Sequence, residues 1–234
     1  MPYYFYYGSG SQDMFLYLMI IVVAILSIWA QFNVSSTFKK NAKVSASMTG
    51  YDAARLILDK NGLYNVQIQR VSGELTDHYD PKANVIRLSE SVYDKYTAAA
   101  VGVAAHEAGH AVQYASNYAP IKLRTAIVPV CNYGSMLAVP LVLIGLLINS
   151  YPLAFAGVIG YGLLAFFQLV TLPVEFNASS RAIALLKNYG TMTNNEIKAS
   201  RKVLTAAALT YVAAFAASSL QFLRLLLIVA RRRD

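Results

Sequence analysis

Cysteine and histidine are the scarce residues of this chain. The single cysteine, Cys131, excludes a disulfide framework and a cysteine-based metal site within one chain. Histidine occurs three times in 234 residues, as His78, His106 and His110. Charged residues make up 14% of the chain, and residues 125–174 contain no Asp, Glu, Lys, Arg or His. Such a long uncharged stretch excludes an ordinary soluble domain.

The uncharged parts of the chain are long apolar segments, which predict membrane helices. Residues 14–32 are uncharged and long enough to cross a bilayer, and without a basic start or a cleavage site they predict a retained anchor. The sequence Asn-Ser-Tyr-Pro at 149–152 divides the uncharged stretch, which predicts two membrane helices joined by a short turn. We expect a single domain over residues 1–234, with membrane helices at 14–32, 127–148 and 151–171, polar segments at 33–124 and 175–202, and a last apolar segment at 203–230.

The last apolar segment leaves two structures open. It contains Arg224 and is divided by Ser218 and Ser219, so it is either one tilted span or a helix followed by a short interfacial helix. The chain therefore has three to four membrane helices. A spanning last segment would carry the arginines at 231–233 outward, against the positive-inside rule, and this conflict favours a non-spanning, re-entrant or shortened last segment.

The distribution of positive charge predicts an orientation. The first thirteen residues carry no Lys or Arg, whereas residues 33–124 carry eleven and residues 175–202 carry five. This bias places the N-terminus outside and both polar segments in the cytoplasm. The net charge of +8 does not indicate nucleic-acid binding, because no basic stripe is interleaved with exposed aromatic residues.

The sequence His-Glu-Ala-Gly-His at 106–110 is the most informative motif. Residues four apart share one face of a helix, so His106 and His110 can bind one Zn²⁺, and Glu107 can reach a water on that ion. Small residues on both sides suit a buried helix at close quarters. The alternative is two core histidines one turn apart. It would not explain why a glutamate occurs in such an apolar segment.

The polar segment before this motif predicts a small α+β portion. A short amphipathic helix begins after residue 47 and ends at Asn61-Gly62. Residues 66–71 alternate as a strand, and residues 75–79 and 84–88 flank a hairpin turn. We expect a short β-sheet that either pairs with an extended peptide substrate along an edge strand or only covers the metal helix. The fold class is thus a mainly α integral membrane protein with a small zincin-like α+β catalytic portion.

A catalytic zinc site needs a third protein ligand. Glu175 is the first charge after the uncharged stretch, in a helical pattern of small residues, and a metal would be a suitable partner for it. It could instead cap a helix N-terminus. His78, on the hairpin, is a candidate zinc ligand, oxyanion donor or simple turn residue. Tyr79 is a further candidate oxyanion donor. Asn177 and Arg181 are candidates to hold the zinc-bound carboxylate or a substrate carbonyl. For Arg181 the alternative is a surface salt bridge.

Four motifs in order, LTDHYDP, AAHEAGHAVQ, TLPVEFNASSRA and KVLTAAALTYVAA, resemble those of the YugP-type bacterial membrane zinc metallopeptidases. The resemblance extends over residues 49–227. It implies an integral-membrane zinc metallopeptidase of the bacterial inner membrane. In the HtpX-like proteases, which are related in plan, the third ligand is a Glu on a later helix, which corresponds here to Glu175.

Together these features predict a zinc-dependent metalloendopeptidase. His106, His110 and Glu175 hold Zn²⁺, Glu107 acts as the general base, and the site lies near the cytoplasmic membrane face. The expected partners are a protein or peptide substrate and the lipid bilayer. Gly157 and its neighbours permit close helix packing within or between chains, so an oligomer is possible. Alternatives are a site-2-type intramembrane protease, or a non-enzymatic zinc scaffold or transporter, although the uncharged stretch has few residues to line a transport path.

Overall fold

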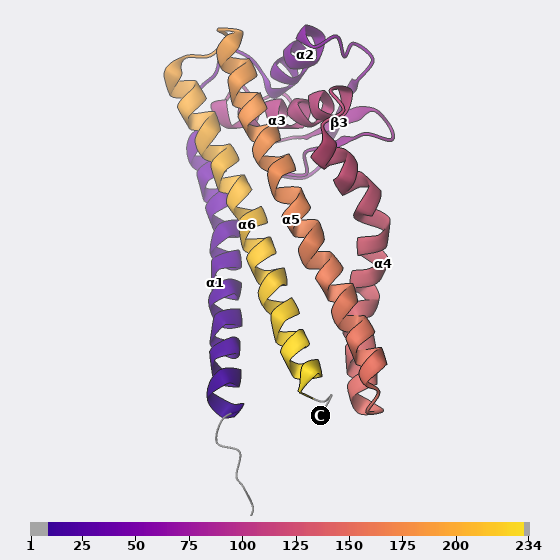
Figure 1. The fold of residues 1–234 in the computed structure, drawn as a ribbon. Coiled ribbons are helices and arrows are strands. Elements are labelled where there is room, and N and C mark those ends of the chain that lie inside the picture. The colour runs from indigo at the N-terminus through magenta and orange to yellow at the C-terminus, as the bar shows by residue number, and fades with distance from the viewer. Residues whose placement is uncertain (1–8, 232–234) are drawn as a thin grey trace, which may run out of the picture. The chain divides into compact units, whose positions relative to one another are not determined.

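The computed structural model describes residues 9–231, and it is mainly helical (Figure 1). Four helices are long and apolar enough to cross a membrane by length and composition, which confirms the predicted fold class. In chain order the elements are α1 (Ser9–Asn41), α2 (Gly50–Lys60), β1 (Gln67–Val71), β2 (His78–Asp80), β3 (Val85–Ser89), α3 (Ala98–Ala115), α4 (Ala119–Leu147), α5 (Tyr151–Asn188) and α6 (Asn194–Ala230).

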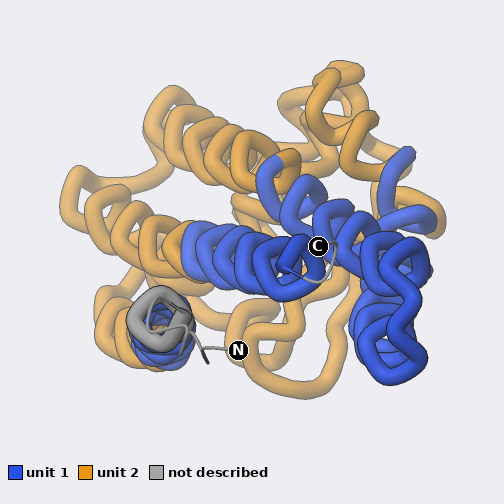
Figure 2. The backbone as a smooth tube through the Cα atoms, turned by 60° about the horizontal axis from the view of Figure 1, so that its bottom comes forward, with its two compact units in different colours: residues 1–29, 126–169, 212–234 blue, residues 30–125, 170–211 orange. Residues whose placement is uncertain are grey.

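The chain divides into two compact units (Figure 2). The first comprises residues 1–29, 126–169 and 212–234, and holds segments of the four long helices. The second comprises residues 30–125 and 170–211, and holds α2, α3 and the three strands together with the remaining segments of those helices. All of the candidate site residues named above belong to the second unit.

Small residues bring the helices of the first unit into close contact. A Cβ added at Gly157 or Gly160 of α5 would lie 2.5 or 2.7 Å from a carbonyl oxygen of α4. One added at Gly162 would lie 3.0 Å from the ring of Phe222 on α6. These glycines therefore serve packing within the chain, as in other membrane helix pairs.

The last apolar segment forms one unbroken helix. Residues 203–230 lie within α6, which continues through both serines, so the structure has one helix here and not two. By length and composition this helix could cross a membrane. The guanidinium of Arg224 lies 4.5 Å from the ring centroid of Tyr17 on α1, a cation–π contact that offsets part of the cost of a charge in an apolar segment.

The third predicted membrane helix is longer than expected. The sequence predicts a membrane helix at residues 151–171 and a polar segment from residue 175, whereas α5 is one helix that continues through Pro173 as far as Asn188. The chain turns only at residues 189–193, where Gly190 has a φ of 64°. Glu175, which follows the uncharged stretch directly, is therefore within a helix and not at the start of one.

The short helix and the hairpin predicted before the motif are both present. Thr49 and Asp52 form a reciprocal capping box at the start of α2, and Gly62, with a φ of 72°, follows its end. In the sheet, of order β1-β3-β2, β3 pairs with β1 in parallel and with β2 in antiparallel fashion. The strand predicted at residues 75–79 is reduced to β2, because Gly73 and Leu75 adopt positive φ angles that continue the preceding turn. β2, an edge strand of the sheet, and the central strand β3 both contact α3.

Helix α3 lies in the core of the second unit. Thr97 caps it by accepting a hydrogen bond from the backbone N–H of Ala100, and most of its residues are buried. Its glycines let two other helices approach: an added Cβ would lie 2.9 Å from Ser200 of α6 at Gly102, and 2.9 Å from the carbonyl oxygen of Ala178 of α5 at Gly109. The His-Glu-Ala-Gly-His sequence at 106–110 therefore lies on a helix that contacts both α5 and α6.

Candidate metal centre

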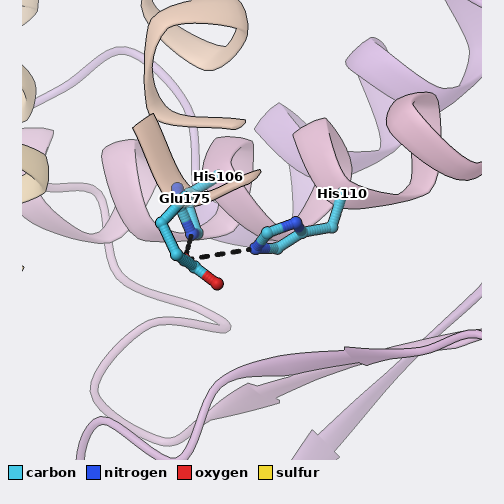
Figure 3. Close-up of side chains that lie close together, drawn as sticks. All are labelled: His106, His110 and Glu175. Atoms are coloured by element: carbon cyan, nitrogen blue, oxygen red, sulfur yellow. Dashed lines mark ion pairs between the residues drawn. The ribbon is translucent and has the colours of Figure 1, made fainter. Parts of the chain in front are cut away.

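The two histidines of α3 and the predicted carboxylate of α5 meet in one cluster (Figure 3). Glu175 Oε2 lies 3.3 Å from Nε2 of His106 and 3.6 Å from Nε2 of His110. The two imidazole rings lie 4.7 Å apart, nearly perpendicular to each other. Glu175 and His110 are buried, and His106 is nearly so.

The donor set fits a zinc ion. Two ligand atoms each about 2.0–2.1 Å from a tetrahedral zinc lie about 3.3–3.4 Å apart, close to the observed separations. Glu175 Oε2 is buried and has no hydrogen-bond partner among the described residues. A buried carboxylate oxygen facing two imidazole nitrogens is costly unless a positive charge lies among them, and a divalent cation supplies that charge.

Gln113 determines the tautomer of His110. The side-chain nitrogen of Gln113 donates to the carbonyl oxygen of Val174 (2.8 Å) and to Oδ1 of Asn177 (3.0 Å), so its remaining amide atom is the oxygen. That oxygen lies 2.9 Å from Nδ1 of His110 and can only accept a proton from it. Nδ1 therefore carries a hydrogen, which leaves Nε2, the nitrogen that faces Glu175, as the one that can ligate a metal.

His106 is held from the other helix. Its Nδ1 lies 3.1 Å from the hydroxyl of Ser179, which lies one turn beyond Glu175 on α5. Both histidines are thus fixed through Nδ1, and both turn Nε2 toward the same carboxylate oxygen. Contacts of this kind orient metal ligands and tune their basicity.

Arg181 and Asn177 lie behind the ligands. The Arg181 Nε donates to Oδ1 of Asn177 at 2.8 Å, and the guanidinium lies 5.7 Å from the ring centroid of Tyr118. Asn177 in turn accepts from Gln113, which holds His110. Arg181 thus reaches the cluster through two intermediate side chains.

The structure does not bring His78 into this cluster. Its Nδ1 lies 2.9 Å from the carbonyl oxygen of Thr76, and its Nε2 lies 3.3 Å from Nη1 of Arg87, which also donates to Asp80. Both ring nitrogens are therefore engaged on the hairpin.

Tyr79, the other hairpin candidate, also has a local partner. Its hydroxyl donates to Oδ1 of Asn84 at 3.1 Å. Its ring packs edge-on against Tyr114 of α3, with centroids 5.6 Å apart. This contact ties the edge strand β2 to the metal helix.

Burial and neighbouring carboxylates shift the pKa values of two groups around the centre, His110 and Asp77. Burial acts to lower the pKa of His110, but Glu175, Glu107 and Gln113 together raise it above its ordinary value. Burial raises the pKa of Asp77, against hydrogen bonds from Ser89, and the negative charge of Glu107 raises it further. Glu107 is itself only 8% exposed. The centre therefore favours added positive charge.

Two residues that the sequence did not single out belong to this site. Arg124 of α4 places Nη1 3.6 Å from Oε1 of Glu175, the oxygen that does not face the histidines. The Tyr211 hydroxyl of α6 interacts with Glu175, and it also lies in the electrostatic range of Glu107 and Arg124. Arg124 is the last charged residue before the uncharged stretch, and Tyr211 lies within the last of the four motifs, KVLTAAALTYVAA. Neither feature by itself shows that the residue contacts Glu175.

Comparison with known proteins assigns the chain to a family. Residues 16–230 match the family described as "Putative neutral zinc metallopeptidase", and the chain belongs to that family. It is 49% identical over 222 residues to "Putative membrane protease YugP" of Bacillus subtilis (strain 168), covering 94% of this chain and 99% of the relative. No solved structure matches the chain. These findings confirm the resemblance drawn from the four motifs, and with it zinc as the cofactor and the membrane as the location.

Proposed function

We propose that this protein is a zinc-dependent endopeptidase in which His106, His110 and Glu175 hold the ion and Glu107 is the general base. The observation that carries the proposal is the convergence of two imidazole nitrogens on a buried carboxylate oxygen without another partner. Glu107 lies next to a ligand on the same helix, which is the position a general base requires.

The chemistry divides between the ion and the chain. Zinc, when bound, polarises the scissile carbonyl and lowers the pKa of water toward neutrality. Glu107 takes a proton from the attacking water as the new carbon–oxygen bond forms, and gives a proton to the amine nitrogen as the carbon–nitrogen bond breaks. The low exposure of Glu107 keeps bulk water from competing for these protons.

The other side chains act as positioning residues. Arg124 holds one oxygen of Glu175 by charge, which directs the second oxygen toward the histidines. Arg181, through Asn177 and Gln113, fixes the tautomer of His110. We assign His78 no part in the reaction, because both of its ring nitrogens are engaged on the hairpin.

The edge strand β2 is the proposed docking strand for an extended substrate. It contacts α3, and its hydrogen-bonding edge away from β3 is not used by another strand of the sheet. A peptide added there would run alongside the helix that carries Glu107.

We place the centre at the cytoplasmic face of the inner membrane. The ligand helix α3 is not among the helices that meet the length and composition of a span, and it packs with α2 and the sheet in the second unit. Lys39 and Lys40 at the end of α1 and Lys122 near the start of α4 belong to the second unit, and their positive charge favours the cytoplasmic side for that unit. The arginines that follow α6 are the exception to this rule. An intramembrane site would instead need the motif on a spanning helix.

Zinc content and cleavage of an unfolded protein test this proposal together. Glu107→Gln should retain one zinc per chain and lose peptide hydrolysis, because the ligands remain and the base does not. His106→Ala should lose both zinc and activity. Normal cleavage by Glu107→Gln would overturn the assignment, and a Glu90→Gln variant, changed at an exposed site, controls for loss of charge.

A further inference from the structure

A groove runs between α5 and α6 in the second unit, on residues that the proposed reaction does not use apart from Ser179. Its volume is about 510 Å³. Ile183 of α5 and Leu204 and Ala208 of α6 are buried and form its floor. Exposed residues line its sides, and the groove is therefore open along its length.

The groove has one apolar end and one cationic end. At the apolar end lies Phe176 of α5, next to the uncharged stretch of that helix. On the side of the α5–α6 turn the lining includes Lys187 of α5 and Arg201, the first lining residue of α6. Both are exposed, and neither forms an ion pair among the described residues. Phe176 and Lys187 are eleven positions apart, which corresponds to about 16 Å along the helix.

We propose that this groove binds one anionic phospholipid, with its phosphate at Lys187 and Arg201 and an acyl chain along the floor. The polarity of the groove changes in the direction that such a lipid requires, since α5 carries no charge from residue 151 to residue 174, just before Phe176. Two unpaired cations at one end match a phosphodiester, and the buried aliphatic floor matches a hydrocarbon chain. A soluble anion would use the cations but leave the floor exposed to water.

The bound lipid would lie next to the metal centre. Ser179 lines the groove and also contacts Nδ1 of His106. Occupation of the groove would hold α5 and α6 at a fixed separation at the turn that bears this contact. The membrane would then contribute to the site as a ligand as well as a location.

Native mass spectrometry of the full-length protein tests the proposal. Protein in detergent is titrated with phosphatidylglycerol and, separately, with phosphatidylcholine of the same acyl chains. The double variant Lys187→Gln/Arg201→Gln should bind phosphatidylglycerol about 30-fold more weakly, at about fivefold for each cation. Lys198→Gln/Lys202→Gln removes the same charge from exposed positions of α6 outside the groove, and should bind as wild type does.

A second variant tests the apolar part. Ala184→Trp places a bulky ring on an exposed side of the groove without disturbing the core, and should also lose the lipid. Equal binding by all variants, or equal affinity for both lipids, would overturn the proposal. So would a benzophenone side chain at Thr205 that forms adducts with polypeptide and not with lipid. Because the readout is lipid binding, its failure would leave the proposed peptidase activity untouched.

Discussion

The crossing of α3 and α5 should control zinc affinity, and Gly109→Ala tests it. Gly109 precedes His110 on α3 and faces Ala178, which lies about one turn beyond Glu175 on α5. An added Cβ would lie 2.9 Å from the carbonyl oxygen of Ala178 and 3.5 Å from its carbonyl carbon. Since ordinary carbon–oxygen contacts begin at about 3.3–3.6 Å, the helices must separate by about 0.5 Å.

That separation acts directly on the ligand geometry. His110 and Glu175 belong to the two helices that move apart, and their ligand atoms are 3.6 Å apart before the change. Metal–ligand distances tolerate deviations of only about 0.2 Å. We therefore expect zinc to bind about 10–100-fold more weakly, or about 1.4–2.7 kcal/mol, as when a supporting partner of a ligand is removed.

Global stability should change much less than zinc affinity. Alanine improves helix propensity by up to about 1 kcal/mol, which offsets part of an overpacking cost of about 1–3 kcal/mol. Gly102→Ala is the matched control, because its Cβ would lie 2.9 Å from Ser200 of α6, at a crossing that does not bear Glu175.

Competition with a fluorescent zinc chelator measures the affinity of each purified variant. The expected order is wild type, then Gly102→Ala, then Gly109→Ala with the weakest binding. A Gly109→Ala protein that binds zinc as tightly as Gly102→Ala would refute the argument that this crossing sets the distance between the ligands.

The supporting contacts yield three further predictions. Gln113→Leu removes the acceptor that fixes His110 and should weaken zinc about 10–100-fold by chelator competition, whereas an unchanged affinity would remove Gln113 from the site. Arg124→Gln removes the positive charge beside one oxygen of Glu175 and should weaken zinc binding by about tenfold or less, since the pair is partly exposed. Added salt should lower the zinc affinity of wild type more than that of this variant, because salt screens the pair. His78→Ala should leave zinc content unchanged, and loss of zinc in that variant would make the histidine a ligand.

The sequence indicated the three residues that meet in the cluster better than the residues that contact them. The spacing of two histidines on a helix and the first charge after a long uncharged stretch both depend on local pattern, and they pointed to His106, His110 and Glu175, which the structure brings together. Gln113 and Ser179 have no such pattern. They matter because α3 and α5 cross, which places residues more than sixty positions apart within hydrogen-bonding distance.

The fold shows the same division. The capping residues of α2 and the turn before β3 are local signals, and both elements formed where we expected them. The parallel pairing of β1 with β3 was not predicted, because parallel strands do not follow from a turn between them. As a result β3, the last strand before the motif, is central, and β2 is the edge strand next to α3.

The length of α5 is the feature that joins these observations. Sequence hydropathy ends the membrane segment near residue 171, because polar residues begin at Glu175. A helix break there would have freed Glu175 from the register of the apolar segment. In the continuous helix, Glu175 and Ser179 lie one turn apart and share a face, so one element supplies a ligand and the support of the opposite ligand. The rotation of α5 about its own axis therefore sets both contacts at once, and the close approach of α3 to α5 at Gly109 and Ala178 sets the distance across which they form.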